Sequence, residues 1–204
     1  MKPIIFQVEA GGQIRPVELA FATEAGVKRI RRWQRTRPGT DAGEFAALAA
    51  KRWLYYSRQR ATVATFDELR AAIGRSERGE FAFLMVASAG WAKRQRFLAL
   101  AFCRRSWCHH LILDLLAVRP GLSFANQPIR RTGTGVLFGL VSLASALGME
   151  LIWGEATADS APFYERVLQI RPVKDLFIID GGAMRGIHDR YITNQNSQKS
   201  QLAY

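Results

Sequence analysis

The sequence predicts an α+β fold with a mixed, mostly antiparallel central sheet flanked by helices. Two observations carry this prediction. Helical patterns fill residues 20–75, and three strand-like stretches then follow one another directly over residues 80–118. Beyond them helical and strand-like patterns alternate, which is the order of a sheet with helices on its faces. The chain of 204 residues is 49% hydrophobic and 23% charged, a composition that can bury an ordinary core.

Three helices are predicted in the first part of the chain. In residues 26–37 apolar side chains recur every third position, as one face of a helix requires, and Pro38 with Gly39 ends the pattern. The next two predicted helices are AGEFAALAAKRWLYYSRQR, capped by Asp41, and FDELRAAI, opened by Thr65 or Asp67 and closed by Gly74.

Strand-like stretches and two later helices complete the predicted layout. Strands are predicted at residues 3–8, 80–88, 96–104, 110–118, 149–156 and 175–180. The stretch at 110–118 is almost wholly apolar, which is typical of a strand at the centre of a sheet. Helices are predicted at 136–147, ended by Gly148, and at 161–170, capped by Asp159 or Ser160.

The same patterns predict how the chain is divided. We expect residues 1–192 to form a single domain, with a helical part at 20–75 and a core at 80–180 that carries the functional site. Regular structure is predicted to end at Asp180. Residues 193–204 are polar and are predicted to form a flexible tail.

Charge and cysteine content restrict the kind of protein. The formal net charge of +12 favours a polyanionic partner, such as nucleic acid, an acidic membrane face or a multiply phosphorylated small molecule. Two cysteines so close together, Cys103 and Cys108, make no disulfide framework and fit a reducing compartment. The N-terminus lacks the features of a signal peptide, and the most apolar run, 136–149, is shorter than the roughly 20 residues of a spanning helix. We therefore expect a cytoplasmic protein without a membrane segment.

The stretch RRTGTGVLFG at residues 130–139 is the strongest chemical signal. Its two glycines stand beside two arginines at the predicted start of a helix. The first turn of a helix leaves backbone N–H groups unpaired and carries partial positive charge, so it binds anions. Glycine lets the backbone approach such a ligand closely. The stretch therefore predicts a phosphate site formed by Arg130, Arg131, Thr132, Gly133, Thr134 and Gly135.

The residues around the glycines exclude two common phosphate-binding motifs. A P-loop has Lys and then Ser or Thr after its second glycine, whereas Val136 and Leu137 follow Gly135. A dinucleotide-binding fingerprint has a third small residue and follows a strand directly. Here position 138 is Phe, and the preceding predicted strand ends at Val118.

A third motif fits the spacing. The stretch 130–135 has the form Q/R-x-x-G-x-G/A and resembles the pyrophosphate-binding motif of GNAT-type N-acetyltransferases. LDLLAVRPG upstream resembles the fourth strand of that family, and WGEATADSAPFYERVL downstream resembles its fifth strand and the following helix. In the downstream stretch Asp159 stands where Asn is common, and Tyr164 matches the family's tyrosine. The three motifs cover residues 111–168, under a third of the chain.

The resemblance implies a GNAT-like fold and an acetyl-CoA-dependent N-acetyltransferase that acts by direct transfer in a ternary complex. It places the pyrophosphate of acetyl-CoA on the loop 130–135 and Asp159 at the cofactor site. The pantetheine would lie along the backbone of Leu116, Ala117 and Val118. Tyr164 would be the general acid that protonates the leaving thiolate. The alternative is that Tyr164 is an amphipathic side chain packed on its helix.

A general base for the acceptor amine has three candidates. Asp114 is a carboxylate inside an apolar strand, where a charge requires a reason; the alternative is a salt-bridged structural residue that faces away from the site. Glu155, at the end of the next predicted strand, is the second candidate. A chain of water molecules is the third.

The acceptor and the partners stay open at this stage. The basic segment 28–37 carries cations and Trp33, a combination that binds RNA when the indole is exposed; the alternative is a solvated helix face with Trp33 packed inward. The acceptor is a small amine, a protein amine or an aminoacyl-tRNA, and a positive rim would favour an acidic or phosphorylated one. A second class of function is a nucleic-acid-binding or regulatory GNAT-like module without turnover. The oligomeric state, a homodimer included, is equally open.

Cysteines and histidines at 103–110 invite a metal interpretation. Cys103 and Cys108 have a spacing found in zinc sites, and His109 and His110 follow directly. Adjacent residues of a strand point to opposite faces, so the two imidazoles do not converge. A turn between two strands explains the cluster equally well, and we predict no metal site.

Overall fold

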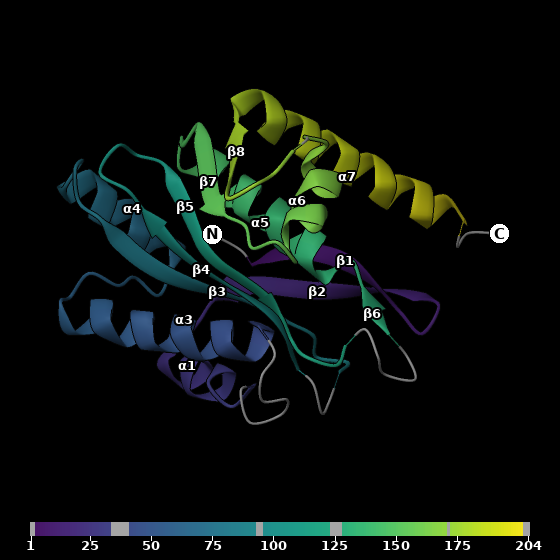
Figure 1. Cartoon of the computed structure of the whole chain (residues 1–204), viewed down its shortest axis with the longest axis horizontal. Helices are drawn as coiled ribbons and strands as arrows, with labels where there is room; N and C mark the ends of the chain where they lie inside the picture. Colours follow the sequence, from purple (N-terminus) through teal and green to yellow (C-terminus); the bar gives the residue numbers. More distant parts are fainter. Residues whose placement is uncertain (1–2, 34–40, 93–95, 123–127, 171, 202–204) are drawn as a thin grey trace.

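The computed structural model describes residues 3–33, 41–92, 96–122, 128–170 and 172–201, with the backbone alone for 194–201. The strands within these residues are β1 (Ile4–Ala10), β2 (Gln13–Phe21), β3 (Phe81–Ser88), β4 (Phe97–Arg105), β5 (Leu111–Val118), β6 (Ile129–Arg130), β7 (Leu151–Glu155) and β8 (Leu176–Asp180). They form one sheet in the order β6-β1-β2-β3-β4-β5-β7-β8 (Figure 1). Every neighbouring pair is antiparallel except β5 and β7, which are parallel. The predicted fold class is confirmed.

The three successive strands predicted at 80–118 are β3, β4 and β5, each within one residue of its predicted start. Their pairs are antiparallel, and the backbone between β4 and β5 reverses over five residues. β5 lies between β4 and β7, which confirms its predicted place inside the sheet. Long apolar runs suit these strands because helices cover both of their faces.

A hairpin at the N-terminus extends the sheet beyond the predicted strands. β1 pairs with β2 along its whole length, from Ile4 opposite Leu19 to Ala10 opposite Gln13. Gly11 and Gly12 form the turn with φ of 58° and 75°, a conformation that glycine adopts without strain. β2 was not predicted from the sequence, because Pro16 interrupts the stretch; buried and exposed residues alternate only over residues 16–19.

Among the described residues, the helices α1 (Glu24–Ile30) and α3 (Asp41–Arg58) cover one face of the sheet (Figure 1). Val27, Ile30 and Trp33 are buried in a core cluster with alanines of α3, which confirms the predicted apolar stripe and the inward orientation of the indole. The helix predicted over 26–37 begins at Glu24 and ends at Ile30; residues 34–37 lie outside the described residues.

The opposite face carries α4 (Phe66–Arg75), α5 (Thr132–Ala146), α6 (Ala161–Leu168) and α7 (Gly181–Gln201). Thr65 caps α4 by accepting a hydrogen bond from the Glu68 N–H at 3.1 Å, and this helix runs one residue beyond its predicted end at Gly74. α5 begins four residues earlier than predicted, so that both glycines of the phosphate motif lie inside its first turn.

The prediction that regular structure ends at Asp180 is wrong. α7 starts at the next residue and continues to Gln201, through most of the segment predicted as a flexible tail. Met184 and Ile187 fix its first half in the core next to α5. No helix among the described residues is long and apolar enough to cross a membrane.

Candidate functional site

A β-bulge in β5 shapes the centre of the molecule. Phe102 pairs with Leu115 and Cys103 with Leu113, so Asp114 is an extra residue without a partner on β4. The extra residue reverses the alternation of the strand. Leu113 and Leu116 consequently belong to the core on the α5 face, whereas Leu115 belongs to the core on the α3 face.

The bulge coincides with the point at which β5 and β7 separate. The two parallel strands pair from Leu111 opposite Ile152 to Leu113 opposite Gly154, and no pair follows. β5 itself continues to Val118, held on its other edge by β4. The backbone edge of residues 115–118 that faces β7 is therefore open, which leaves its N–H and C=O groups available to a ligand.

The first turn of α5 lies beside this opening. Arg131 precedes the helix with a φ of 67°, in the left-handed region, and the Gly135 N–H donates to its carbonyl at 3.0 Å. No side chain of the described residues caps the helix, so the first N–H groups remain free for an anion.

The two glycines of this turn have different surroundings. A Cβ at Gly135 would overlap the ring of Phe6, so this glycine allows the helix to approach β1. A Cβ at Gly133 would lie 3.1 Å from the end of the Phe163 ring, which comes from α6. Gly133 therefore borders the space in front of the helix, and Gly135 serves the packing behind it.

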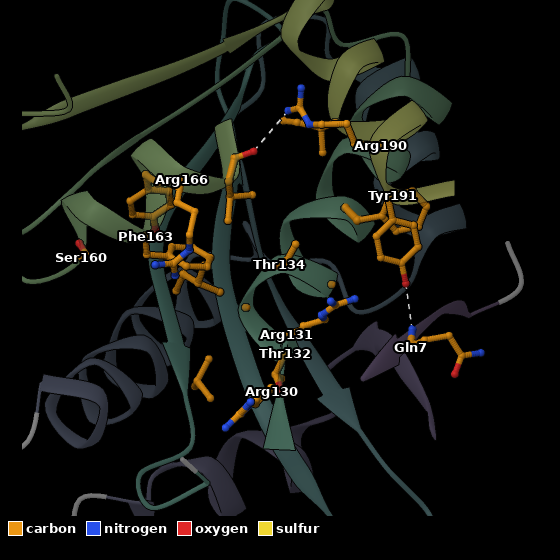
Figure 2. A pocket seen from close by; sticks show the side chains of 18 of the residues that line it. Gln7, Arg130, Arg131, Thr132, Thr134, Ser160, Phe163, Arg166, Arg190 and Tyr191 are labelled. Carbon is orange, nitrogen blue, oxygen red and sulfur yellow. Dashed lines mark hydrogen bonds between the residues drawn. The ribbon is translucent and has the colours of Figure 1, made fainter. Parts of the chain in front are cut away.

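A cleft of about 700 Å³ runs in front of this turn, and we call it the α5 cleft. Leu116 and Val118 of β5 line one end, the loop 130–135 lines the middle, and residues of α6 and α7 line the remainder. Figure 2 shows Phe163 and Arg166 on one side of Thr134, with Tyr191 on the other. The Tyr191 hydroxyl accepts a hydrogen bond from the Gln7 N–H at 2.9 Å, which ties α7 to β1 (Figure 2).

The α5 cleft is strongly basic. Its described lining residues include four arginines, namely Arg130, Arg131, Arg166 and Arg190. The same described residues include no carboxylate. Arg130 lies 4.0 Å from the half-buried Glu9, and Arg190 donates to two neutral oxygens, the Gln169 side-chain oxygen and the Val167 carbonyl. Thr132 adds a buried hydroxyl that has no hydrogen-bond partner among the described residues. A buried polar atom without a partner and several uncompensated cations fit a phosphorylated ligand.

A second cleft of about 910 Å³ lies on the other side of the opening, and we call it the α3 cleft. Its walls are α3 on one side and the chain around the ends of β7 and β8 on the other, with β4 and β5 as the floor. Leu116, Ser160 and Tyr164 line both clefts. The two clefts therefore meet at these three residues, at the separation of β5 from β7.

Tyr164 lies at this junction. It is 4% exposed and its ring stacks on Phe177 with 4.1 Å between centroids. Burial, and to a smaller degree the neighbouring Cys103, raise the pKa of the phenol well above its ordinary value. The group is therefore protonated at neutral pH, as a general acid must be.

Asp114 faces the α3 cleft and is bound on both oxygens. Arg104 donates from Nε at 2.6 Å and from Nη2 at 2.8 Å, and Arg52 of α3 lies 3.4 Å away. Arg104 also donates to Glu80 at 3.0 Å, and the Tyr56 hydroxyl donates to the same oxygen at 2.8 Å. The ion pairs match the salt-bridged alternative for Asp114, but the residue lines the α3 cleft and does not face away from it. The bidentate arrangement ties the bulge to β4, and Arg52 ties it to α3.

Charges in this network hold one another in place. Hydrogen bonding to Asp114 raises the pKa of Arg104. Burial raises the pKa of Glu80, but hydrogen bonds from Arg104 and Tyr56 outweigh it, so the pKa of Glu80 is lowered overall. Both arginines of the α3 cleft are thus paired with carboxylates.

The remaining predicted residues occupy different places. Glu155 is exposed at the end of β7 and lines the α3 cleft. Ala117 belongs to the core on the α3 face, so only its backbone reaches the opening. Asp159 is exposed in the turn before α6, outside the lining of both clefts. The two α5-cleft arginines beyond the motif, Arg166 and Arg190, were missed because they come from α6 and from the unpredicted α7.

The cysteine–histidine cluster lies at the turn between β4 and β5. Cys103 is buried in the core, while Cys108 is exposed with its sulfur 3.2 Å from His110 Nδ1. His109 instead contacts the buried Arg105 and the Leu147 carbonyl. The described residues contain no group of three metal-ligating side chains.

Comparison with known proteins gives the fold. No protein-family model matches the sequence, and neither does any curated protein. Among solved structures, AtaTR bound with AcCoA has a TM-score of 0.50 at 12% identity, over 83% of this chain and 96% of that chain. The chain has a GNAT-type fold.

Two further solved structures that are similar to this chain are described as acetyltransferases. A putative GNAT-family acetyltransferase from Desulfovibrio desulfuricans has a TM-score of 0.49 at 13% identity, over 81% of this chain and 99% of that chain. PaiA N-acetyltransferase from Thermoplasma acidophilum, in complex with coenzyme A, has a TM-score of 0.46 at 11% identity, over 80% and 98%. At these identities the likeness of the GNAT-type structures concerns the fold alone.

Proposed function

We propose that this chain is an acetyl-CoA-dependent N-acetyltransferase that moves an acetyl group to a primary amine by direct attack in a ternary complex. The observation that carries the proposal is the meeting of two clefts at Tyr164, where β5 and β7 separate. One cleft is basic and elongated, and the other opens on the opposite side of the same residues. Two substrates that enter from opposite sides are thereby brought together, which a transfer without a covalent enzyme intermediate requires.

In this proposal the α5 cleft holds the acetyl donor. The first turn of α5 and the arginines of the loop 130–135 bind the diphosphate, with the unpaired hydroxyl of Thr132 beside them. The open backbone edge of Leu116, Ala117 and Val118 pairs with the amide groups of the pantetheine arm. Asp159 stays a prediction on the turn that leads to α6.

Acetyl-CoA would supply the acetyl thioester and would leave as the free thiol. Tyr164 holds its proton at the junction of the clefts and delivers it from the phenol oxygen to the departing sulfur.

The amine must lose a proton before or during attack. Glu155 is our candidate base because it lines the α3 cleft and no salt bridge to it is seen in the described part of the chain. Asp114 is the weaker candidate, since both of its oxygens accept from Arg104. A water molecule relaying the proton to Glu155 satisfies the same geometry.

Titration calorimetry of acetyl-CoA tests the donor site. We expect micromolar affinity for the wild-type protein and roughly tenfold weaker binding for Arg131→Ala, since a charge-assisted hydrogen bond is worth about 1.5–3 kcal/mol. Arg70→Ala is the matched control, because Arg70 is an exposed cation of α4 outside both clefts. A wild-type protein that binds no acetyl-CoA but binds RNA with steep salt dependence would be a nucleic-acid-binding module.

A further inference from the structure

The α3 cleft also restricts the acceptor, on the condition that the proposed function holds. We infer that the acceptor is a small primary amine with an apolar or aromatic carbon skeleton, and neither a polyanion nor a polyamine. Three properties of the cleft support this inference: its lining charges, its apolar wall and its volume.

The charges of the α3 cleft differ from those of the whole chain. The net charge of the chain is +12, yet two arginines and three carboxylates line this cleft. Both arginines, Arg52 and Arg104, are paired with Asp114. A phosphorylated or nucleic-acid acceptor would therefore find no unpaired cation among the described lining residues.

The two other carboxylates stand on the wall opposite α3. Glu155 and Asp175 are exposed, and the described residues offer neither of them a salt bridge. They face a cleft that leads directly to Tyr164. A positive ammonium group is attracted to such a rim and is delivered to the junction, where it must become neutral to react. Two exposed carboxylates are enough to attract one ammonium group, but they cannot pair with every ammonium group of a polyamine.

Apart from Arg52, the α3 wall is lined by apolar and aromatic side chains. Leu48 and Tyr55 line the cleft although they are 38% and 59% exposed, and Phe45 lies beside them. Leu176 of β8, 50% exposed, faces the cleft from the other wall. Exposed apolar side chains at the mouth of a cleft bind apolar ligand surface, because both surfaces then leave water.

The volume of the cleft indicates a small molecule. At about 910 Å³ it lies in the range of small-molecule pockets, roughly 300–1,000 Å³. The basic α5 cleft and the mixed α3 cleft thus sort the two substrates by charge, with the polyanion on one side of Tyr164 and the apolar amine on the other.

Steady-state acetylation of three amines tests the inference: phenethylamine, spermidine and phosphoethanolamine, each at saturating acetyl-CoA. We expect kcat/KM for phenethylamine to exceed the other two by at least about tenfold. Leu48→Ala should raise its KM about tenfold, because it removes apolar contact area. Leu54→Ala is the matched control, since Leu54 is 40% exposed on the same helix but outside the cleft, and it should change KM less than about twofold.

Two substitutions of glutamate test the role of the carboxylates. Glu155→Gln should lower kcat/KM for phenethylamine by threefold or more, whereas Glu150→Gln, exposed before β7 and outside the cleft, should leave it unchanged. Preference for spermidine, phosphoethanolamine or an aminoacyl-tRNA would overturn the inference, as would equal effects of the two leucine variants. A dimer that Leu48→Ala dissociates would assign the apolar wall to a second copy of the chain and would also overturn it. Calorimetric binding of acetyl-CoA in the same preparation separates these outcomes from a failure of the proposed function.

Discussion

The phenol of Tyr164 is the group on which the proposed chemistry depends most directly. Its local sequence, Pro-Phe-Tyr at the start of α6, was sufficient to single it out before the structure was known. What the sequence lacked was its environment: Phe177 of β8 under the ring, and Cys103 of β4 nearby. These contacts come from strands distant in the chain, and they bury the side chain and raise the pKa of the phenol above its ordinary value.

We expect Tyr164→Phe to lower kcat about a hundredfold, since general acid catalysis contributes about 10²–10⁴. The ring and its stacking remain, so acetyl-CoA affinity and thermal stability should stay near wild-type values. Because the pKa of Tyr164 is raised above its ordinary 10.0, wild-type activity should not fall through phenol deprotonation at any pH below 10. Stopped-flow rates across pH check both statements, and a Tyr164→Phe enzyme with unchanged kcat would leave Tyr164 a packing residue.

Asp114 illustrates the limit of prediction at this scale. A carboxylate in an apolar strand indicates a special role. Whether Asp114 is a general base or a salt-bridged structural residue depends on which side chains surround it. Arg104 lies on the neighbouring strand and Arg52 on α3, and nothing local in the sequence pairs them with Asp114.

For Asp114→Asn we expect the free energy of unfolding to fall by about 2–4 kcal/mol, because the guanidinium of Arg104 loses its bidentate carboxylate partner and keeps only Glu80. Acetylation should persist in this variant, whereas kcat/KM should fall by threefold or more in Glu155→Gln, because Glu155 is the proposed acceptor of the amine proton. Urea unfolding and kcat/KM are the two measurements. The reverse pattern, with activity lost in a folded Asp114→Asn protein alone, would make Asp114 the base.

At the scale of elements, periodic patterns identified the central strands and most helices. β2 and α7 were missed for related reasons. β2 contains Pro16 and depends on β1 and β3 for its hydrogen bonds. α7 is polar, begins with two glycines, and contacts the core through few residues. In both, tertiary contacts stabilise a structure that the local sequence favours only weakly.

The position of α5 against β1 gives a prediction for its two glycines. Gly135→Ala should destabilise the fold by about 1–3 kcal/mol, because the added methyl overlaps Phe6 in a close-packed core. Gly133→Ala meets only the end of the Phe163 ring and should cost less than about 1 kcal/mol while weakening acetyl-CoA binding. Denaturant midpoints and calorimetry distinguish the two effects. Equal loss of stability in both variants would contradict the assigned difference.

α7 supplies the far wall of the α5 cleft, and this predicts a specific role for Arg190. Arg190→Gln should weaken acetyl-CoA binding several-fold but leave acetyl-pantetheine, which lacks the nucleotide, unaffected. Arg185→Gln removes an exposed cation from the same helix outside the cleft and serves as the control. If both thioesters lose affinity equally in Arg190→Gln, α7 supports the fold and not the nucleotide end.

At the scale of the molecule, the excess positive charge is unevenly distributed. The net charge of +12 suggested polyanions, and the structure places four arginines along the α5 cleft, whose described lining residues include no carboxylate. The sequence gives only the net charge of the whole chain. Which carboxylates pair with Arg52 and Arg104 depends on how α3 and β4 pack against β5. That distribution, unlike the fold class, could not be read from composition.

The uneven distribution predicts different salt responses for the two substrates. Raising NaCl from about 50 to 500 mM should weaken acetyl-CoA binding several-fold, because in the proposed site its phosphates would lie against exposed arginines that salt screens. The KM of an apolar amine should change less than about twofold over the same range. Initial rates with each substrate varied in turn provide the measurement, and a parallel response of both would contradict the separation of charge.

The separation of β5 from β7 has a consequence for how the protein recognises its donor. Beyond Leu113, β5 has no paired strand on the side of β7 in the described residues. A ligand with several amide groups can form the hydrogen bonds of the missing strand. Amide hydrogens of residues 115–118 on that edge should exchange with solvent rapidly in the free protein and slowly once the donor is bound. The ligand would then be a structural member of the sheet, completing the backbone pairing that the chain itself leaves open.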